Sequence, residues 1–102
     1  MPRPRKHRHC RRHEGDRLFK PRSIPMPELR VINLREDELE ALRLCDMEGL
    51  DQETAGGRMG VSRGTVQRLL KSGRRAVIET LVTGSALLIG DINQEKKETI
   101  QI

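Results

Sequence analysis

The sequence has almost no aromatic residues: Phe19 stands alone, without tryptophan or tyrosine, in a chain of 102 residues. A hydrophobic core must therefore be built from aliphatic side chains, as in small helical domains rather than sandwiches. Recognition of single-stranded RNA is disfavoured for the same reason, because it stacks bases on aromatic rings. A chain of this length forms one small domain at most.

Long apolar runs are also missing. No segment approaches the roughly 20 apolar residues of a transmembrane helix, and the arginine-rich start lacks the apolar segment of a signal peptide. The only two cysteines, Cys10 and Cys45, lie in a basic arm and a predicted helix, so a disulfide framework is not expected. We therefore expect a cytoplasmic protein with reduced thiols and no membrane partner.

Catalytic motifs are absent from the sequence as well. It contains no glycine-rich phosphate loop and no Ser/His/Asp pattern, so we predict neither an enzyme nor a cofactor. A cluster of zinc-type ligands occurs near the start, at His7, His9, Cys10 and His13. Its tight spacing and the lack of a second ligand pair disfavour a metal site, which leaves a metal or thiol sensor as an alternative interpretation.

Charge is distributed in blocks along the chain, which carries a net charge of +5. Residues 1–22 hold nine Lys or Arg and two acids, whereas residues 23–53 hold three against nine. Residues 54–75 hold six and no acid. Two basic blocks separated by an acidic one are typical of a polyanion-binding surface with a water-facing back, although a soluble protein with mixed faces is the alternative.

The pattern divides the chain into three parts. Residues 1–22 are proline- and arginine-rich and are expected to form a basic flexible arm. Residues 23–92 form the predicted domain, and residues 93–102 a frayed tail. Two short apolar segments favour a two-stranded β pairing of about residues 30–34 with 86–90.

The fold class predicted for the domain is mainly α. Apolar spacing predicts three helices, over residues 36–48, 52–59 and 62–82. Asp51 and Ser62 are the expected N-caps of the second and third helices, while Gly49 and Gly84 should end the first and third.

The second and third helices fit a helix-turn-helix. With Gln52 as the first place, Gly56 falls at the fifth place, where only Gly or Ala leaves room for the helices to cross. Gly60 falls at the ninth, in a turn that needs a positive φ. Gly57 should face solvent. The apolar places of the motif are filled by Ala55, Met59, Val61, Val66 and Leu69. A plain helical hairpin with the same core is the alternative.

Residues 62–75 are the predicted recognition helix, placed in the major groove of double-stranded DNA. We predict that Arg63, Gln67 and Arg68 contact base edges, because Arg suits guanine and Gln suits adenine. Ser62 and Thr65 are predicted to contact phosphates or bases. Lys71, Arg74 and Arg75 are predicted to contact mainly phosphates.

The arm begins with arginines separated by prolines, which keep it extended. Arg3 and Arg5 could therefore enter a minor groove, but simple neutralisation of phosphates is the favoured interpretation.

Several short motifs resemble those of one protein family. They are MPRPRK at the start, FKP at 19–21, IPM at 24–26, LEALRL at 39–44, EGL at 48–50 and RMGVSRGT at 58–65. The sequence is similar, from residue 1 to about 88, to a prokaryotic family of small, uncharacterised, predicted DNA-binding proteins. The resemblance implies a mainly helical domain whose helix-turn-helix resembles region 4 of bacterial sigma factors and reads the major groove.

The function predicted from these observations is sequence-specific binding of double-stranded DNA by a transcriptional regulator. The alternative is a sigma-like interaction module that docks on RNA polymerase or another regulator. The oligomeric state stays open, since the long third helix or the two short apolar segments could supply a homodimer interface.

Overall fold

Helices supply most of the fold, as the sequence predicts. The computed structural model describes residues 17–90, and its helices are α1 (Glu36–Leu42), the π-helical continuation η3 (Arg43–Met47), α2 (Gln52–Met59) and α3 (Arg63–Thr83). A 3-10 turn, η2 (Met26–Glu28), lies before α1. The strands are β1 (Arg17–Phe19), β2 (Val31–Leu34) and β3 (Ala86–Ile89). The predicted tail and most of the predicted arm lie outside the described residues.

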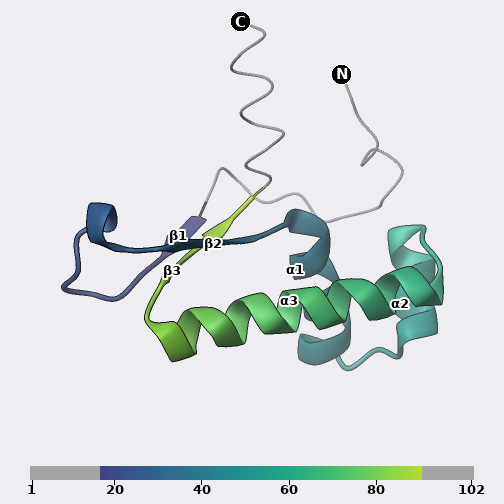
Figure 1. Ribbon diagram of the computed structural model, residues 1–102. Helices are drawn as coiled ribbons and strands as arrows, with labels where there is room; N and C mark the ends of the chain where they lie inside the picture. The colour runs from purple at the N-terminus through teal and green to yellow at the C-terminus, as the bar shows by residue number, and fades with distance from the viewer. Residues whose placement is uncertain (1–16, 91–102) are drawn as a thin grey trace, which may run out of the picture.

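The long helix α3 organises the domain. Figure 1 shows α2 beside its N-terminal end, the sheet over its C-terminal half and α1 between them. Ser62 caps the start of α3, and Gly84 ends it with a left-handed φ of 68°, as predicted. α3 therefore carries its first turns away from the sheet and its last turns beneath it.

The sheet has the strand order β1-β3-β2. β2 runs parallel to β3, with Val31 opposite Ala86 and Leu34 opposite Ile89, which confirms the predicted pairing. β1 pairs antiparallel with the other edge of β3 and was missed, because we assigned residues 17–19 to the flexible arm. Three residues in a basic segment are too few to show the alternation of a strand. The hydrogen-bonding edge of β3, seventy residues further on, is what orders them.

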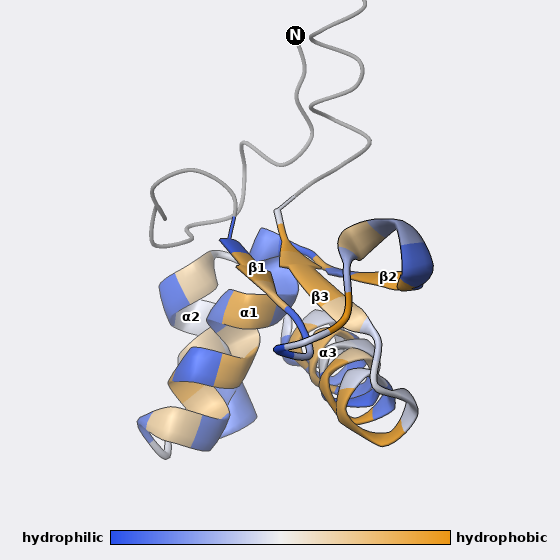
Figure 2. Ribbon diagram, turned by 90° about the vertical axis from the view of Figure 1, so that its left-hand side faces the viewer, coloured by the Kyte–Doolittle hydropathy of each residue, from blue (hydrophilic) through white to orange (hydrophobic). Residues whose placement is uncertain are grey.

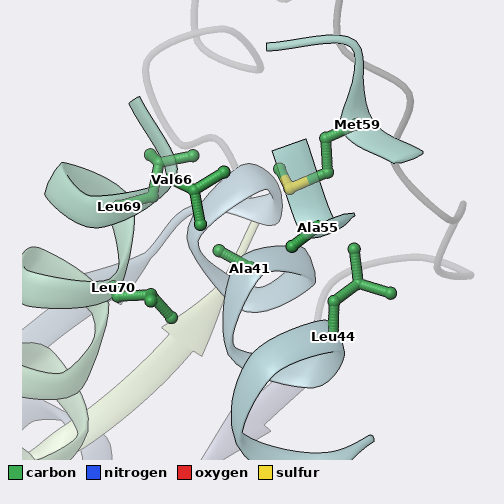
Figure 3. Close-up of a cluster of buried hydrophobic side chains, with 7 residues drawn as sticks. All are labelled: Ala41, Leu44, Ala55, Met59, Val66, Leu69 and Leu70. Carbon is green, nitrogen blue, oxygen red and sulfur yellow. The ribbon is translucent and has the colours of Figure 1, made fainter. Parts of the chain in front are cut away.

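Two aliphatic clusters form the core. One fills the space between α1, α2 and α3 and consists of Ala41, Leu44, Ala55, Met59, Val66, Leu69 and Leu70 (Figure 3). The other joins the sheet to α1 and α3 through Leu34, Leu87 and Ile89. Phe19 is 54% exposed and belongs to neither cluster, so the core is aliphatic as predicted.

α1 and α3 pack closely at Gly73. A Cβ there would lie 3.2 Å from Leu42 Cδ1 and 3.3 Å from Glu38 Cβ, so a side chain would push the helices apart. Beside this contact the Ser72 hydroxyl donates a hydrogen bond to the Glu38 carboxylate. α3 runs through Gly73 without a break, and the close contact fixes where the two helices cross.

The acids of α1 are not a water-facing back. Asp37, Glu38 and Glu40 are buried, with 1%, 6% and 4% of their surface exposed. Glu38 accepts a hydrogen bond of 2.9 Å from the backbone N–H of Arg35, and Glu40 accepts two from Arg43. The expectation of a solvated acidic surface is wrong here, because these carboxylates find partners inside the domain.

Candidate nucleic-acid interface

The turn between α2 and α3 has the geometry that the motif requires. Gly60 adopts a φ of 74°, in the left-handed region, as predicted. The backbone N–H of Val61 donates to the Gly56 carbonyl at 2.9 Å, which closes the end of α2. The turn is therefore tight, and only three residues separate the end of α2 from the start of α3.

The adjacent glycines Gly56 and Gly57 meet opposite surroundings. A Cβ at Gly56 would lie 2.7 Å from the carbonyl oxygen of Val61, a backbone atom that cannot move aside cheaply. The structure thus leaves room for glycine alone, which is narrower than the predicted choice of Gly or Ala. The steric limit comes from the turn backbone rather than from the facing helix. A Cβ at Gly57 would meet no atom within 4 Å, so this residue faces solvent as predicted.

The five apolar places of the motif are occupied as predicted. Ala55, Met59 and Val66 are completely buried, and Leu69 is 4% exposed. Val61 is half-buried and packs against the same cluster. These contacts hold one side of α3 against α2 and α1, so the opposite side of its first half faces outward.

Two side-chain caps set the starts of α2 and α3. Asp51 Oδ1 accepts a hydrogen bond of 2.7 Å from the Thr54 N–H, and this bond lowers the pKa of Asp51. Ser62 Oγ accepts one of 3.1 Å from the Thr65 N–H. The Thr65 hydroxyl is also engaged, since it accepts from Arg68 Nη2 at 3.3 Å. The side chains of Ser62 and Thr65 therefore already make hydrogen bonds that stabilise the start of α3.

Four predicted contact residues, Arg63, Gln67, Arg68 and Lys71, are exposed on the first half of α3 and are called the basic face below. Among residues 17–90, no carboxylate forms an ion pair with Arg63, Arg68 or Lys71. The basic face can therefore bind an anion without first breaking an ion pair within this part of the chain, and only Arg68 would exchange a hydrogen bond, the one that it donates to Thr65.

The two other cations of the predicted set differ from each other. Arg74 donates two hydrogen bonds to Asp46, Nε to Oδ2 at 3.0 Å and Nη2 to Oδ1 at 2.8 Å. These bonds lower the pKa of Asp46 and raise that of Arg74. Arg75 has 83% of its side chain exposed, and its contact with Glu79 is long, with 3.9 Å between Nε and Oε1. Arg74 is thus partly neutralised, whereas Arg75 extends into solvent beyond the basic face.

A cleft runs along one side of the basic face. Its α3 wall includes Arg63, Gln67 and Arg74, and the facing wall carries Asp46, Asp51 and Glu53. Arg68 and Lys71 lie outside this lining. Asp46 is paired with Arg74, so Asp51 and Glu53 are the acids of the cleft that would repel a phosphate backbone. The Arg68 and Lys71 side is therefore the more favourable one for a polyanion. This asymmetry could not be predicted from the sequence, because the acids lie 10 to 28 residues before the cations they face.

Some predicted site residues cannot be placed. Arg3, Arg5 and the cluster of His7, His9, Cys10 and His13 lie outside the described residues. Within residues 17–90, no group of three or more His, Cys, Asp or Glu side chains could hold a metal ion. Cys45 is a half-buried free thiol, and burial raises its pKa. No helix in this range has the length and apolar character needed to span a bilayer.

Comparison with known sequences finds one matching family model and several relatives of this chain. A family model described as "Protein of unknown function DUF134" matches residues 1–96. A "UPF0251 protein" of Pelotomaculum thermopropionicum is 47% identical over 89 residues, which cover 87% of this chain and 67% of the relative. One of Moorella thermoacetica is 48% identical over 87% of this chain and 60% of its own length.

The relatives differ in length. One of Shewanella sediminis is 44% identical over 93% of this chain and 99% of its own length. For most of the first relatives the matched part is less than two thirds of the relative. No solved structure matches the chain.

Proposed function

The chain belongs to the family described as Protein of unknown function DUF134, and from its helix-turn-helix we propose that it is a sequence-specific DNA-binding protein that regulates transcription. The observation that carries the proposal is the basic face: long cationic and amide side chains, exposed on a helix that a tight turn holds clear of its neighbour. A regulator that binds the prokaryotic chromosome works in the cytoplasm.

The dimensions of α3 suit the major groove. The groove is about 12 Å wide and admits a helix, whose diameter with side chains is about 10–12 Å. Of the 21 residues of α3, those of the first half carry the exposed cationic and amide side chains, so this half is proposed to lie in the groove. This half presents Arg63 and Arg68 for the O6 and N7 atoms of guanine and Gln67 for the N6 and N7 atoms of adenine. Each good pair of this kind discriminates against a wrong base by roughly 1–3 kcal/mol.

The phosphate contacts fall mainly on one side. Lys71 and Arg75 are exposed on the side away from the acid-lined cleft, and they are proposed to bind the backbone of one strand. Arg74 is proposed to contribute less, because Asp46 already accepts two of its hydrogen bonds. Arg3 and Arg5 of the arm are proposed to add phosphate contacts on the same duplex.

Selection of bound duplexes from a random library, with the full chain as bait, tests the proposal. We expect enrichment of a common motif, and tighter binding of the selected duplex than of its scrambled version in fluorescence anisotropy. With six or more phosphate contacts, affinity should fall roughly 10³- to 10⁵-fold between 50 and 200 mM salt. No enrichment and no retention of any duplex would overturn the proposal and favour a module that docks on RNA polymerase or another regulator.

A further inference from the structure

The second half of α3 exposes three large apolar side chains. Ile78, Leu81 and Val82 are 57%, 72% and 76% exposed, and together they are called the apolar face. Figure 2 shows hydrophobic residues on the side of α3 that is turned away from the sheet. Among residues 17–90, nothing covers these side chains.

The apolar face continues the basic face along the same side of α3. Leu81 follows Arg63 by 18 residues, which is five turns of 3.6 residues, and Val82 follows Gly64 by the same interval. Ile78 follows Lys71 by seven residues, or nearly two turns. One exposed strip of α3 is therefore polar and cationic in its first half and apolar in its second.

The last turns of α3 are apolar on both sides. Ala76 and Val77 pack against the sheet cluster, while the apolar face points the other way. A polar strip separates the two sides, with Glu79 bound to Arg30 and Thr83 exposed. The sheet covers only one side of this segment and leaves the apolar face exposed, and a cluster of exposed large apolar side chains marks an interaction surface.

We propose that a second copy of this chain covers the apolar face, with α3 against α3 in an antiparallel pair. Their two-fold axis passes the exposed side of the helix at the level of Thr80, whose own side chain is buried. Such a pairing places Ile78 opposite Val82 of the partner subunit, with the Leu81 side chains next to the axis. The patch is thus complementary to itself, as an isologous interface requires. A register centred further back, at Gly73, would instead place Ile78 against the partner's Arg68.

Charge supports the same arrangement. Arg75 lies five residues before Thr80, which brings it beside the end of the partner helix at Gly84 of the partner subunit. The C-terminal end of a helix carries partial negative charge on its last carbonyls, and a cation there is favourable. Arg75 has 83% of its side chain exposed and is able to reach such a position. The two-fold axis makes this contact twice.

The contact leaves the basic faces uncovered. Only the last two turns of each helix overlap, and each basic face projects beyond the end of the partner helix. Three apolar side chains per subunit make a small interface, so we expect a dissociation constant that is micromolar or weaker. The dimer does not depend on the proposed DNA binding and can be tested without DNA.

Sedimentation equilibrium of the full chain over a wide range of concentrations tests the proposal. We expect a monomer–dimer equilibrium whose dissociation constant rises about tenfold or more in Leu81→Glu, because burying an unpaired carboxylate is costly. Leu81→Met should keep the dimer, since it preserves an apolar side chain of similar size. Met47→Glu is the matched control: it adds the same negative charge at another exposed apolar residue, outside both faces, and should leave the equilibrium unchanged.

Two outcomes would overturn the dimer. One is a wild-type chain that stays monomeric at all concentrations, which would leave the apolar face to a different protein. The other is a dimer that Leu81→Glu does not weaken, which would place the interface elsewhere. Should Leu81→Glu lower the melting temperature, Val82→Lys, at the most exposed of the three positions, provides the same comparison.

Discussion

The segment α1–η3 and the first half of α3 both carry many charges, but they use them differently. In α1–η3, Glu40 and Glu48 are both bound by Arg43, and Asp46 is bound by Arg74. In the first half of α3, no ion pair within residues 17–90 involves Arg63, Arg68 or Lys71. The charges of α1–η3 thus stabilise the domain, whereas those of the basic face remain available to a ligand.

The difference follows from position. The carboxylates of α1 lie where α1 meets α3, so burial requires that each has a partner. The basic face lies on the opposite side of α3 from the core, where its side chains are exposed and water solvates each charge without a carboxylate partner among residues 17–90. If the comparison is right, substitutions in α1–η3 change the free energy of unfolding, and substitutions in the basic face change DNA affinity.

The largest expected effect is on DNA binding. Replacing Arg63 and Arg68 together, as Arg63→Ala/Arg68→Ala, should weaken binding of the selected duplex by about 100-fold or more, because each arginine is proposed to bond a guanine. The melting temperature should stay within a few degrees of wild type, since neither side chain is buried or ion-paired. Anisotropy titrations and thermal denaturation measure the two quantities.

A matched control for this variant is Arg30→Ala. Arg30 is exposed and bound to Glu79 at 2.6 Å, near the other end of α3. The substitution Arg30→Ala removes a cation and leaves the basic face unchanged, so only a small, non-specific loss of DNA affinity is expected. Equal losses from this variant and from single substitutions at Arg63 or Arg68 would mean that net charge alone drives binding.

The next largest effect is on stability. Arg43→Met removes the hydrogen bonds to Glu40 and the ion pair with Glu48, and it leaves Glu40 at a buried position without this partner. We expect a loss of roughly 3 kcal/mol in the free energy of unfolding, measured by urea denaturation. Arg75→Met should cost far less, because Arg75 is 83% exposed. A similar cost for both variants would contradict the distinction between the two regions.

The turn between α2 and α3 sets the position of the basic face, and substitutions at Gly56 and Gly57 test this turn. Gly56→Ala should destabilise the domain by about 1–3 kcal/mol, because its Cβ would lie 2.7 Å from the Val61 carbonyl oxygen. Gly57→Ala should stabilise it by about 0.4–1 kcal/mol, since the residue is helical and its Cβ meets open space. Thermal denaturation of both variants measures the contrast, and a lower melting temperature for Gly57→Ala would count against it.

The smallest expected effect concerns the pH dependence of stability. Hydrogen bonds from Arg74 lower the pKa of Asp46 below its unfolded value of about 3.9. The pair therefore stabilises the fold above that value, and its contribution is lost as the pH falls through the lower folded pKa. Both side chains are half-exposed, so the contribution is under about 1 kcal/mol. The stability difference between wild type and Asp46→Asn should be constant from pH 5 to 7 and shrink below about pH 4.

Local features of the fold could be predicted from the sequence. The apolar spacing gave α2 and α3, and Asp51, Ser62 and Gly84 marked their ends, because caps depend on residues a few positions apart. The turn at Gly60 followed from the φ that it requires. The pairing of β2 with β3 was found because both segments are short, apolar and otherwise without partners.

Features that depend on distant residues could not be predicted. β1 exists because the edge of β3 is available to residues 17–19. The ion pair of Arg74 with Asp46 and the acidic wall of the cleft depend on how η3 and α2 pack against α3. Charge blocks counted along the sequence therefore did not distinguish the paired cation Arg74 from the available cations Arg63 and Arg68.

The most direct test of the central claim is an NMR titration of the ¹⁵N-labelled full chain with the selected duplex. We expect the largest shifts at backbone amides of residues 62–71, smaller shifts at Arg75 and little change in α1 and β3. Shifts that concentrate on the sheet or on α1, with residues 62–71 unaffected, would contradict it.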